Sequence, residues 1–281
     1  MDKVKISIVM GVFNPKDRGH LYQAVMSIVN QSFTQWEMII CDDGSGAAYI
    51  DVIKSVAALD SRIKYIRSNR NHGLAHALNR GITVSRGKYI ARMDADDISK
   101  PNRLERLYYF LETHSQYDWV GSNSELFDDN GVWGIGSTRA IPTKKDFLGH
   151  SPYIHPSVMF RRSILIDMKG YKVSDRTVRC EDYELFMRLH RHGYQGYNIQ
   201  EELIQYREDE NSYGRRKYKY CICEMQIRLQ GFRKLGILHV HTSPYVIKPL
   251  IVGLLSPRMQ GYIKKSVRNN NYAQERRNRQ I

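Results

Sequence analysis

The stretch YIARMDADDISKP, residues 89–101, decides how this chain folds. It opens with a short apolar run typical of a buried strand, passes through Asp94, Asp96 and Asp97, and reaches Pro101, where a helical pattern begins. Three carboxylates at the end of a buried strand need a reason, because burying charge is costly. Two interpretations follow from this stretch alone. The carboxylates bind a ligand, or Asp97 or Ser99 caps the next helix.

The same pattern of strand and helix extends upstream of this stretch. Short runs rich in Ile and Val predict strands at residues 5–13, 36–43, 62–68 and 87–94. Apolar residues at helical spacing predict helices between them, at residues 20–32, 47–59 and 73–85. This β-α-β alternation predicts an α/β fold with a mostly parallel central sheet flanked by helices.

The pattern becomes less regular downstream. We expect strands at residues 118–127, at residues 157–162 and near Leu203, and helices after Pro101 and at residues 180–193. Residues 128–153 are rich in Gly and predict loops with a short helix. We therefore expect one α/β domain over residues 1–212 and a basic helical extension with a tail over residues 213–281.

The positive charge of the chain lies almost entirely in this extension. Residues 1–212 hold 28 Lys and Arg against 27 Asp and Glu, whereas residues 213–281 hold 15 against 2. Residues 215–236 predict a basic amphipathic helix, and residues 268–280 predict a disordered tail. The apolar run at residues 245–255 is shorter than the ~20 residues of a spanning helix.

Three interpretations of the extension compete: a nucleic-acid arm, a segment lying on a membrane surface, and a helix packed on the domain. The apolar run favours peripheral contact with a membrane, so we expect no nucleic-acid partner. The four cysteines lack zinc spacing, and the N-terminus lacks the pattern of a secretion signal. We therefore expect a reduced, cytoplasmic protein.

Polar residues gather where the four predicted parallel strands end. In open parallel sheets, ligands bind beyond these carboxyl ends. No dinucleotide-binding or P-loop glycine motif occurs there. Carboxylates repel a diphosphate unless a divalent cation bridges them, which predicts Mg²⁺ or Mn²⁺. Asp94 and Asp96 then serve ribose and metal, or share the metal. In chain order, the strand-end residues are Asn14, Asp42, Asp43, Asn69, Gly73, Asp94, Asp96 and Asp97.

Several of these stretches resemble family 2 glycosyltransferases, which have the GT-A fold. The resemblance is carried by SIVMGVFN at residues 7–14, QSFTQWEMIICDDGS at 31–45 and NRNHGLAHALNRGITVSRGKYIARMDADDISKPNRLE at 69–105. HPSVMFRRSIL at 155–165 and CEDYELFMRLHRHG at 180–193 extend it. The resemblance implies a metal-dependent, inverting transfer of a hexosyl or N-acetylhexosaminyl group from a nucleoside-diphosphate-sugar, usually UDP-linked, to an acceptor hydroxyl.

The resemblance also implies roles for individual residues. The nucleotide-sugar half would span about residues 1–106 and the acceptor half about residues 107–212. Asp182 falls where the family places its catalytic base, and Asp96 is the better metal ligand of the Asp-x-Asp motif, with Asp94 beside it. The residues expected near the nucleotide-sugar are Asn14, Asp42, Asp43, Arg80 and His155.

With membrane contact, the acceptor becomes a saccharide on a polyprenyl diphosphate at the inner face of the plasma membrane. By family analogy, such enzymes build O-antigen, capsule and related surface polysaccharides. Two other classes stay open. A sugar nucleotidyltransferase would carry a Gly-rich loop after its first strand, which GVFNPKDRGH at residues 11–20 does not supply. A non-catalytic protein that binds nucleic acid or membrane would have no need of Asp182.

Overall fold

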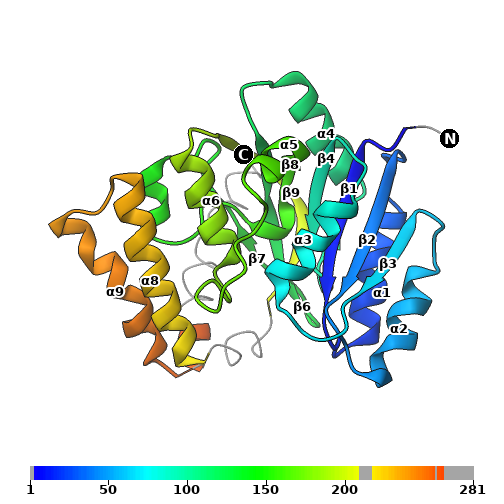
Figure 1. The fold of residues 1–281 in the computed structure, drawn as a ribbon, viewed down its shortest axis with the longest axis horizontal. Helices are drawn as coiled ribbons and strands as arrows, with labels where there is room; N and C mark the ends of the chain where they lie inside the picture. The colour runs from blue at the N-terminus through cyan, green and yellow to red at the C-terminus, as the bar shows by residue number, and fades with distance from the viewer. Residues whose placement is uncertain (1–2, 209–216, 257, 263–281) are drawn as a thin grey trace.

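The computed structural model describes residues 3–208, 217–256 and 258–262, and its first half alternates strands and helices as predicted (Figure 1). Strands β1, β2, β3 and β4 all pair in parallel, in the order β3-β2-β1-β4. Every residue of β2 and β4 is buried, as expected of strands covered on both faces. The elements are β1 (Ile6–Val12), α1 (Arg18–Val29), β2 (Trp36–Asp42), α2 (Ala47–Ala57), β3 (Ile63–Arg67), α3 (Leu74–Val84) and β4 (Tyr89–Met93).

The second half of the sheet is mixed. Strand β8 runs antiparallel to both β4 and β6, while β9 runs parallel to β6 and antiparallel to β5. Parallel pairing is thus confined to the first four strands and to the pair β6 and β9, and the prediction of a sheet flanked by helices is confirmed. The elements are β5 (Ile98–Ser99), α4 (Arg103–Thr113), β6 (Trp119–Asp128), β7 (Gly131–Gly136), β8 (Met159–Arg161), α5 (Arg162–Asp167), α6 (Glu181–Arg191) and β9 (Gly196–Arg207).

Residues 128–153 contain more regular structure than the sequence predicts. Strand β7 folds back on β6 as a hairpin, and the 3₁₀ helices η1 (Lys144–Leu148) and η2 (His155–Ser157) follow. The hairpin turns at Gly131, whose φ of 116° is readily accessible only to glycine. Three of the six residues of β7 are glycines, which weaken the strand signal in the sequence and explain the wrong prediction of a loop there.

Two hydrophobic cores lie on opposite faces of the sheet. Successive side chains of β1 alternate between them, so that Ile8 packs in one core and Val9 in the other. Helices α1, α2 and α4 cover the face of Ile8, and α3, α5 and α6 cover the face of Val9. The carboxyl ends of the first four strands meet at one edge of this sandwich, because these strands are parallel.

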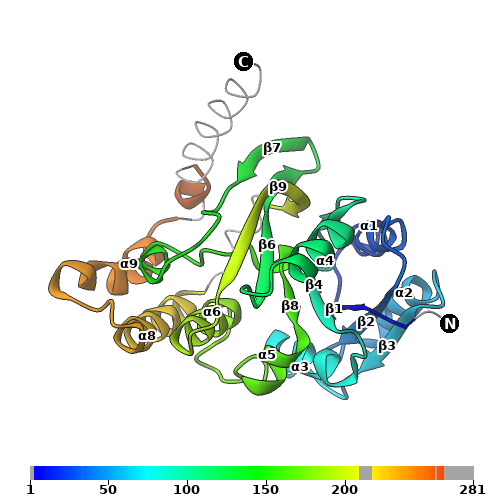
Figure 2. The ribbon, with the colours of Figure 1, turned by 90° about the horizontal axis from the view of Figure 1, so that it is seen from above.

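The described part of the C-terminal extension, residues 217–256 and 258–262, is largely helical, and its helix α8 packs on α6. Helix α8 (Tyr218–Leu235) lies between α6 and α9 (Ser243–Gly253), with η3 (Val240–Thr242) leading into α9 (Figures 1 and 2). The predicted basic helix is thereby confirmed over α8, and Phe232 of α8 is fully buried in the core shared with α6. The predicted tail at residues 268–280 lies outside the described residues. Among the residues that the structure describes, none of the helices combines the length and hydrophobicity that crossing a membrane requires.

Candidate active site

The loops after β1 and β2 are tied together by Asn14. Its backbone N–H donates to Ser45 Oγ at 2.9 Å, and its side-chain Oδ1 accepts from the backbone N–H of Gly46 at 2.8 Å. Asn14 adopts a left-handed conformation with φ of 44°, which Asn tolerates better than most residues. The first predicted site residue therefore shapes the strand-end loops that would receive a nucleotide.

Asp42 and Asp43 are buried and hold neighbouring loops in place. Asp42 Oδ2 accepts hydrogen bonds from Tyr65 Oη at 2.7 Å and Arg67 Nε at 3.1 Å. Asp43 Oδ2 accepts from the backbone N–H of Gly73 at 2.7 Å, just before α3 begins. These bonds hold the segments around the ends of β2 and β3 against each other, so both carboxylates stabilise the fold.

Asn69 and Arg80 lie on the third loop and the helix that follows it. Arg80 Nη1 donates to Ser68 Oγ at 2.7 Å, while Asn69 is exposed and its Oδ1 is 3.4 Å from His72 Nε2. The ring of His72 packs on that of His76, with 4.4 Å between their centroids. These contacts bring the predicted residues of the third strand end beside those of the second.

The Asp-x-Asp stretch follows β4, and a buried arginine holds its first carboxylate. Arg92 Nη2 forms an ion pair with Asp94 Oδ1, and the Arg92 side chain is only 3% exposed. Asp97 is also buried, and its Oδ1 accepts from the backbone N–H of Arg207 at 2.9 Å. Burial, followed by the charges of Asp94 and Asp96, raises the pKa of Asp97 well above its usual range.

A second buried arginine, Arg103, stabilises the backbone of this stretch through hydrogen bonds. Arg103 of α4 is fully buried, and its Nη2 donates to the backbone oxygens of Arg92 at 2.6 Å and Pro156 at 2.8 Å. One side chain thus joins β4 to η2. Burial lowers the pKa of Arg103 to about 10, and the negative charge of Asp97 offsets part of that lowering.

The donor set at this stretch fits a divalent cation held jointly with a diphosphate. No three His, Cys, Asp or Glu side chains converge into a complete metal site among the described residues. Mg²⁺ and Mn²⁺ commonly take only one or two carboxylates and fill their coordination with phosphate and water oxygens. Asp97 Oδ2 is buried without a hydrogen-bond partner in this part of the chain, and the neighbouring charges raise its pKa. A cation would offset that excess of negative charge.

Asp182 lies in the first turn of α6, beside Glu181. Burial, and then the charge of Glu181, raises the pKa of Asp182 to about 6. The positive charge of Arg92 acts in the opposite direction and lowers the pKa of both carboxyl groups. A carboxylate with this pKa is ionised at neutral pH and still basic enough to accept a proton from a reacting hydroxyl.

His155 is brought close to the same centre. Its Nε2 is 2.7 Å from Tyr171 Oη, and burial together with the charge of Arg92 lowers the pKa of His155, which keeps the ring neutral. Burial raises the pKa of Tyr171, the charge of Arg92 lowers it, and the charges of Asp182 and Asp94 raise it further. The structure therefore gathers the Asp-x-Asp stretch, His155 and Asp182 around one buried guanidinium.

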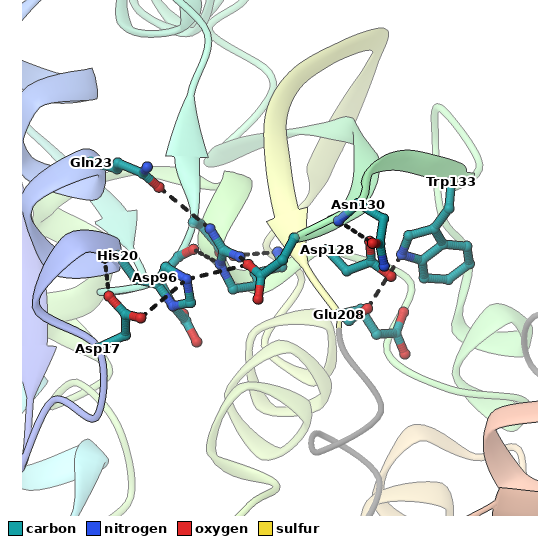
Figure 3. A network of polar contacts seen from close by, with 11 residues as sticks. Asp17, His20, Gln23, Asp96, Asp128, Asn130, Trp133 and Glu208 are labelled. Atoms are coloured by element: carbon teal, nitrogen blue, oxygen red, sulfur yellow. Dashed lines mark hydrogen bonds and ion pairs between the residues drawn. The ribbon is translucent and has the colours of Figure 1, made fainter.

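A polar network beside Asp96 ties the loop to distant parts of the chain (Figure 3). Arg207, at the end of β9, donates from Nε to the backbone oxygen of Asp96 at 3.1 Å and from Nη1 to Asp129 Oδ1 at 2.7 Å. His20 Nε2 lies 3.5 Å from Asp129 Oδ1 and 3.8 Å from Asp17 Oδ2. The tip of the β6–β7 hairpin is thereby joined to the start of α1 and to the Asp-x-Asp loop.

Sequence reasoning missed the basic residues that organise this centre. Arg92, Arg103 and Tyr171 were not among the predicted site residues. A signal was available for Arg92, since an arginine inside the buried run YIARM requires a charged partner nearby. No comparable local signal marks Arg103, whose partners lie on other elements.

The chain is similar in sequence to known glycosyltransferases. Residues 7–169 match the model of the family described as Glycosyl transferase family 2. EpsE of Bacillus subtilis (strain 168), provisionally described as a glycosyltransferase, is 37% identical over 94% of this chain and 95% of its own. The Escherichia coli enzyme named UDP-Gal:alpha-D-GlcNAc-diphosphoundecaprenol beta-1,3-galactosyltransferase is 28% identical over 95% of this chain and 97% of its own.

Solved structures with the same fold include proteins in complex with nucleotide-sugars. TarS residues 1–349 of S. aureus, in complex with UDP-GlcNAc, superimposes with a TM-score of 0.65 at 14% identity, covering 89% of this chain and 72% of that one. The mannosyltransferase PcManGT of Pyrobaculum calidifontis, in complex with GDP-Man and Mn²⁺, gives 0.62 at 16% identity, covering 89% and 74%. These similarities confirm the GT-A-like fold predicted from the sequence.

Proposed function

Because this chain belongs to glycosyl transferase family 2, we propose that it transfers a hexosyl or N-acetylhexosaminyl group, with inversion, from a UDP-linked donor to a saccharide hydroxyl. The observation that carries the proposal is the cluster around Arg92. The Asp-x-Asp stretch and Asp182, which lie far apart in the sequence, both interact with its charge. The residues proposed to bind the donor and the proposed general base are therefore linked through the same guanidinium.

In the proposed reaction, Asp182 acts as the general base. A carboxylate oxygen of Asp182 takes the proton of the acceptor hydroxyl as that oxygen bonds to the anomeric carbon. The bond from the anomeric carbon to the diphosphate oxygen breaks on the opposite face, which inverts the configuration. The pKa of about 6 supports this role, because the carboxylate is ionised at neutral pH before the acceptor arrives.

We propose that Asp96, with Asp94 beside it, holds Mn²⁺ or Mg²⁺. The bound cation would offset the negative charge that develops on the departing diphosphate. As the second carboxylate of the Asp-x-Asp motif, Asp96 is proposed as the primary ligand, and Asp94, which is paired with Arg92, can also accept from the ribose. The relative crystallised with GDP-Man and Mn²⁺ supports this assignment by analogy.

The nucleotide and the diphosphate would lie across the strand-end loops. Asp43 and Asp42 would accept from uracil or ribose, and the remaining contacts would come from residues on the same edge of the sheet. The hydrogen bonds that join these loops support a preformed site. The residues proposed to complete it are Asn14, Asn69, Gly73, Arg80 and His155.

The acceptor is proposed to be a saccharide on a polyprenyl diphosphate, for a surface polysaccharide such as O-antigen or capsule. The E. coli relative whose name includes diphosphoundecaprenol supports this acceptor class, since the similarity spans nearly the whole of both chains. Such an acceptor places the enzyme at the inner face of the plasma membrane. The basic extension over residues 213–281 would then provide peripheral contact with the membrane, beside a catalytic domain over residues 1–212.

Calorimetric titration with UDP, GDP and their sugar conjugates, with and without Mn²⁺, tests the donor site. We expect metal-dependent binding of UDP that Asp96→Ala weakens at least tenfold, a change of about 1.4 kcal/mol. The control Asp51→Ala removes an exposed carboxylate of α2 and should bind as the wild type does. Transfer is then measured with a synthetic GlcNAc-diphospholipid. Absence of nucleotide binding under every condition would disprove the proposal.

A further inference from the structure

Large apolar side chains are exposed along one face of α9. Ile247, Ile251 and Leu254 are four and three residues apart, so they line one side of the helix. Ile251 is 58% exposed and Leu254 is 76% exposed, while Val246 on the opposite side is buried. Val240, in the turn before α9, is 91% exposed. We call Val240, Ile247, Ile251 and Leu254 the outer face of α9.

This face lies at the margin of the molecule. In both views α9 is the outermost helix on its side, with α8 between it and α6 (Figures 1 and 2). Gly253 allows the two helices to approach closely, since a Cβ there would lie 2.6 Å from Cys221 Sγ of α8. The inner side of α9 is thus occupied by α8, and the outer face has no covering element among the described residues.

The charge around this face is almost entirely positive. Residues 217–262 contain seven Lys and Arg and one acidic residue, Glu224. Glu224 is paired with Arg228 at 2.8 Å, so its charge is already balanced within α8. The cations on exposed positions are Lys217, Lys219, Arg233, Lys234, Lys248 and Arg258. An apolar stripe beside unbalanced cations matches the interface of a bilayer that contains anionic lipids.

A second copy of the chain is a poorer occupant for the same reason. A two-fold dimer would set this surface against itself, which brings like charges together around the apolar stripe. The net charge favours a negatively charged partner instead. Nucleic acid is negative too, yet it offers no apolar phase to receive Ile251 and Leu254.

We propose that the outer face of α9 docks on an anionic lipid bilayer. Its apolar side chains enter the boundary between headgroups and acyl chains, and the surrounding cations meet the headgroups. This proposal rests on the membrane contact given under the proposed function and names the surface that makes it. Because α8 joins α9 to α6, whose first turn carries Asp182, docking would hold the candidate base at a defined height above the lipid.

Vesicle flotation of the full-length protein tests the surface. We expect binding to vesicles that contain phosphatidylglycerol, weaker binding to phosphatidylcholine alone, and partial loss at high salt. The double variant I251S/L254S should lower the partition coefficient roughly tenfold, because two large apolar side chains no longer enter the interface. The matched control V84S/I166S alters exposed apolar residues of α3 and α5 and should leave binding unchanged.

A second variant gives a direct spectroscopic signal. The emission of Leu254→Trp should shift to the blue when anionic vesicles are added, as the indole leaves water. Wild-type binding that I251S/L254S retains, or no blue shift, would overturn the proposal. So would a wild-type dimer that I251S/L254S converts to a monomer without any binding to vesicles, since a second copy would then cover the face.

The failure of this inference can be told apart from the failure of the proposed function. Nucleotide titration and transfer to a soluble acceptor require no vesicles. Vesicle binding without nucleotide binding or transfer would therefore contradict only the proposed function. Transfer to a soluble acceptor without vesicle binding would contradict the assigned surface and the proposed membrane contact, and would leave the proposed donor site and transfer reaction standing.

Discussion

At the scale of single residues, the centre combines a buried guanidinium with partly buried carboxylates. Asp182 is held beside Glu181 with its pKa raised to about 6, and Asp94 is paired with the buried Arg92. A buried carboxylate destabilises the fold unless its neighbours compensate it, so such a group is retained where it serves a function. Activity and stability should therefore respond in opposite directions when Asp182 loses its charge.

The first prediction concerns the pH dependence of transfer. The value of kcat should rise with pH through about 6, because Asp182 must be ionised to accept a proton. Asp182→Asn should lower kcat by about 10²- to 10⁴-fold and leave the Kd of UDP unchanged. Glu181→Gln should move the acidic limb to lower pH, since it removes a negative neighbour. Initial rates from pH 4.5 to 8 check this, and an unmoved limb in Glu181→Gln would contradict the coupling.

The second prediction concerns stability. The pKa of Asp182 is raised from 3.8 to about 6 on folding, so the folded state binds more protons between these values. The wild type therefore loses stability as pH rises through this window. Asp182→Asn should be more stable than the wild type by about 1 to 3 kcal/mol above pH 6 and equal to it below pH 4. Urea unfolding at several pH values measures the gap, and a gap independent of pH would refute this linkage.

At the scale of elements, the sequence predicted strands and helices where one local pattern decides them. Strands β1 to β4 and helices α1 to α3 appear close to their expected bounds. Strands β1, β2 and β4 are buried almost throughout, which gives each a mostly apolar run in the sequence, and apolar residues at helical spacing mark the helices. Strand β5 has two residues, and β9 begins at Gly196, upstream of the predicted strand near Leu203. Both depend on pairing with distant strands, which no local pattern encodes.

The candidate site divides in the same way. Strand-end residues such as Asp43 and Asp94 could be located from the sequence, because parallel strands place their carboxyl ends at one edge. Their partners could not be assigned, since the charge of Arg92 lowers the pKa of Asp182 from 90 positions away in the sequence and Asp97 is bonded to Arg207. Such contacts follow from the order of the strands, and the mixed second half of the sheet was not predicted.

The third prediction tests the role of α4. Arg103→Met should destabilise the protein by about 2 to 4 kcal/mol, because the backbone oxygens of Arg92 and Pro156 lose a buried donor and Asp97 loses a balancing charge. Arg106→Met, on the exposed side of the same helix, should change stability by less than about 0.5 kcal/mol. Urea denaturation measures the free energy of unfolding of both variants. Equal losses in the two would contradict the stabilising role of the Arg103 hydrogen bonds.

The fourth prediction concerns the loop after β2. Gly44 has φ of 77°, and a Cβ there would lie 2.3 Å from the backbone carbon of Arg70. Gly44→Ala should therefore destabilise the protein by about 2 kcal/mol or more and weaken UDP binding, because the loop must move. Gly149→Ala meets nothing within 4 Å and should be neutral or slightly stabilising. A Gly44→Ala protein with unchanged Tm would rule out this constraint.

At the scale of the whole molecule, the extension and the sheet share a core. The side chains of Ile227, Phe232 and Leu235 on α8, and Val246 on α9, are buried in the cluster that contains α6. Burying each large apolar side chain contributes about 1.5 to 3 kcal/mol, and four of them together approach the total stability of a typical domain. We infer that the extension supports the fold as well as the proposed membrane contact.

The fifth prediction follows from this shared core. A chain truncated after residue 212 should have a Tm at least about 10 °C lower or should aggregate, because the surface of α6 that α8 covers becomes exposed. A chain truncated after residue 262 keeps both helices and serves as the control. Thermal unfolding of the two proteins decides the matter. Equal Tm values would mean that residues 1–212 fold independently.

The place of β9 in the sheet sets the order in which the protein can assemble during translation. Strand β9 pairs with both β5 and β6, and its last residue, Arg207, secures the loop of Asp96. At about 5 to 20 residues per second, the ribosome delivers β9 several seconds after β5. The four parallel strands can form a nascent nucleotide-binding half in that interval. The loop of Asp96, the proposed metal ligand, would remain unsecured until synthesis reaches β9, which makes acquisition of the proposed cofactor one of the last steps of maturation.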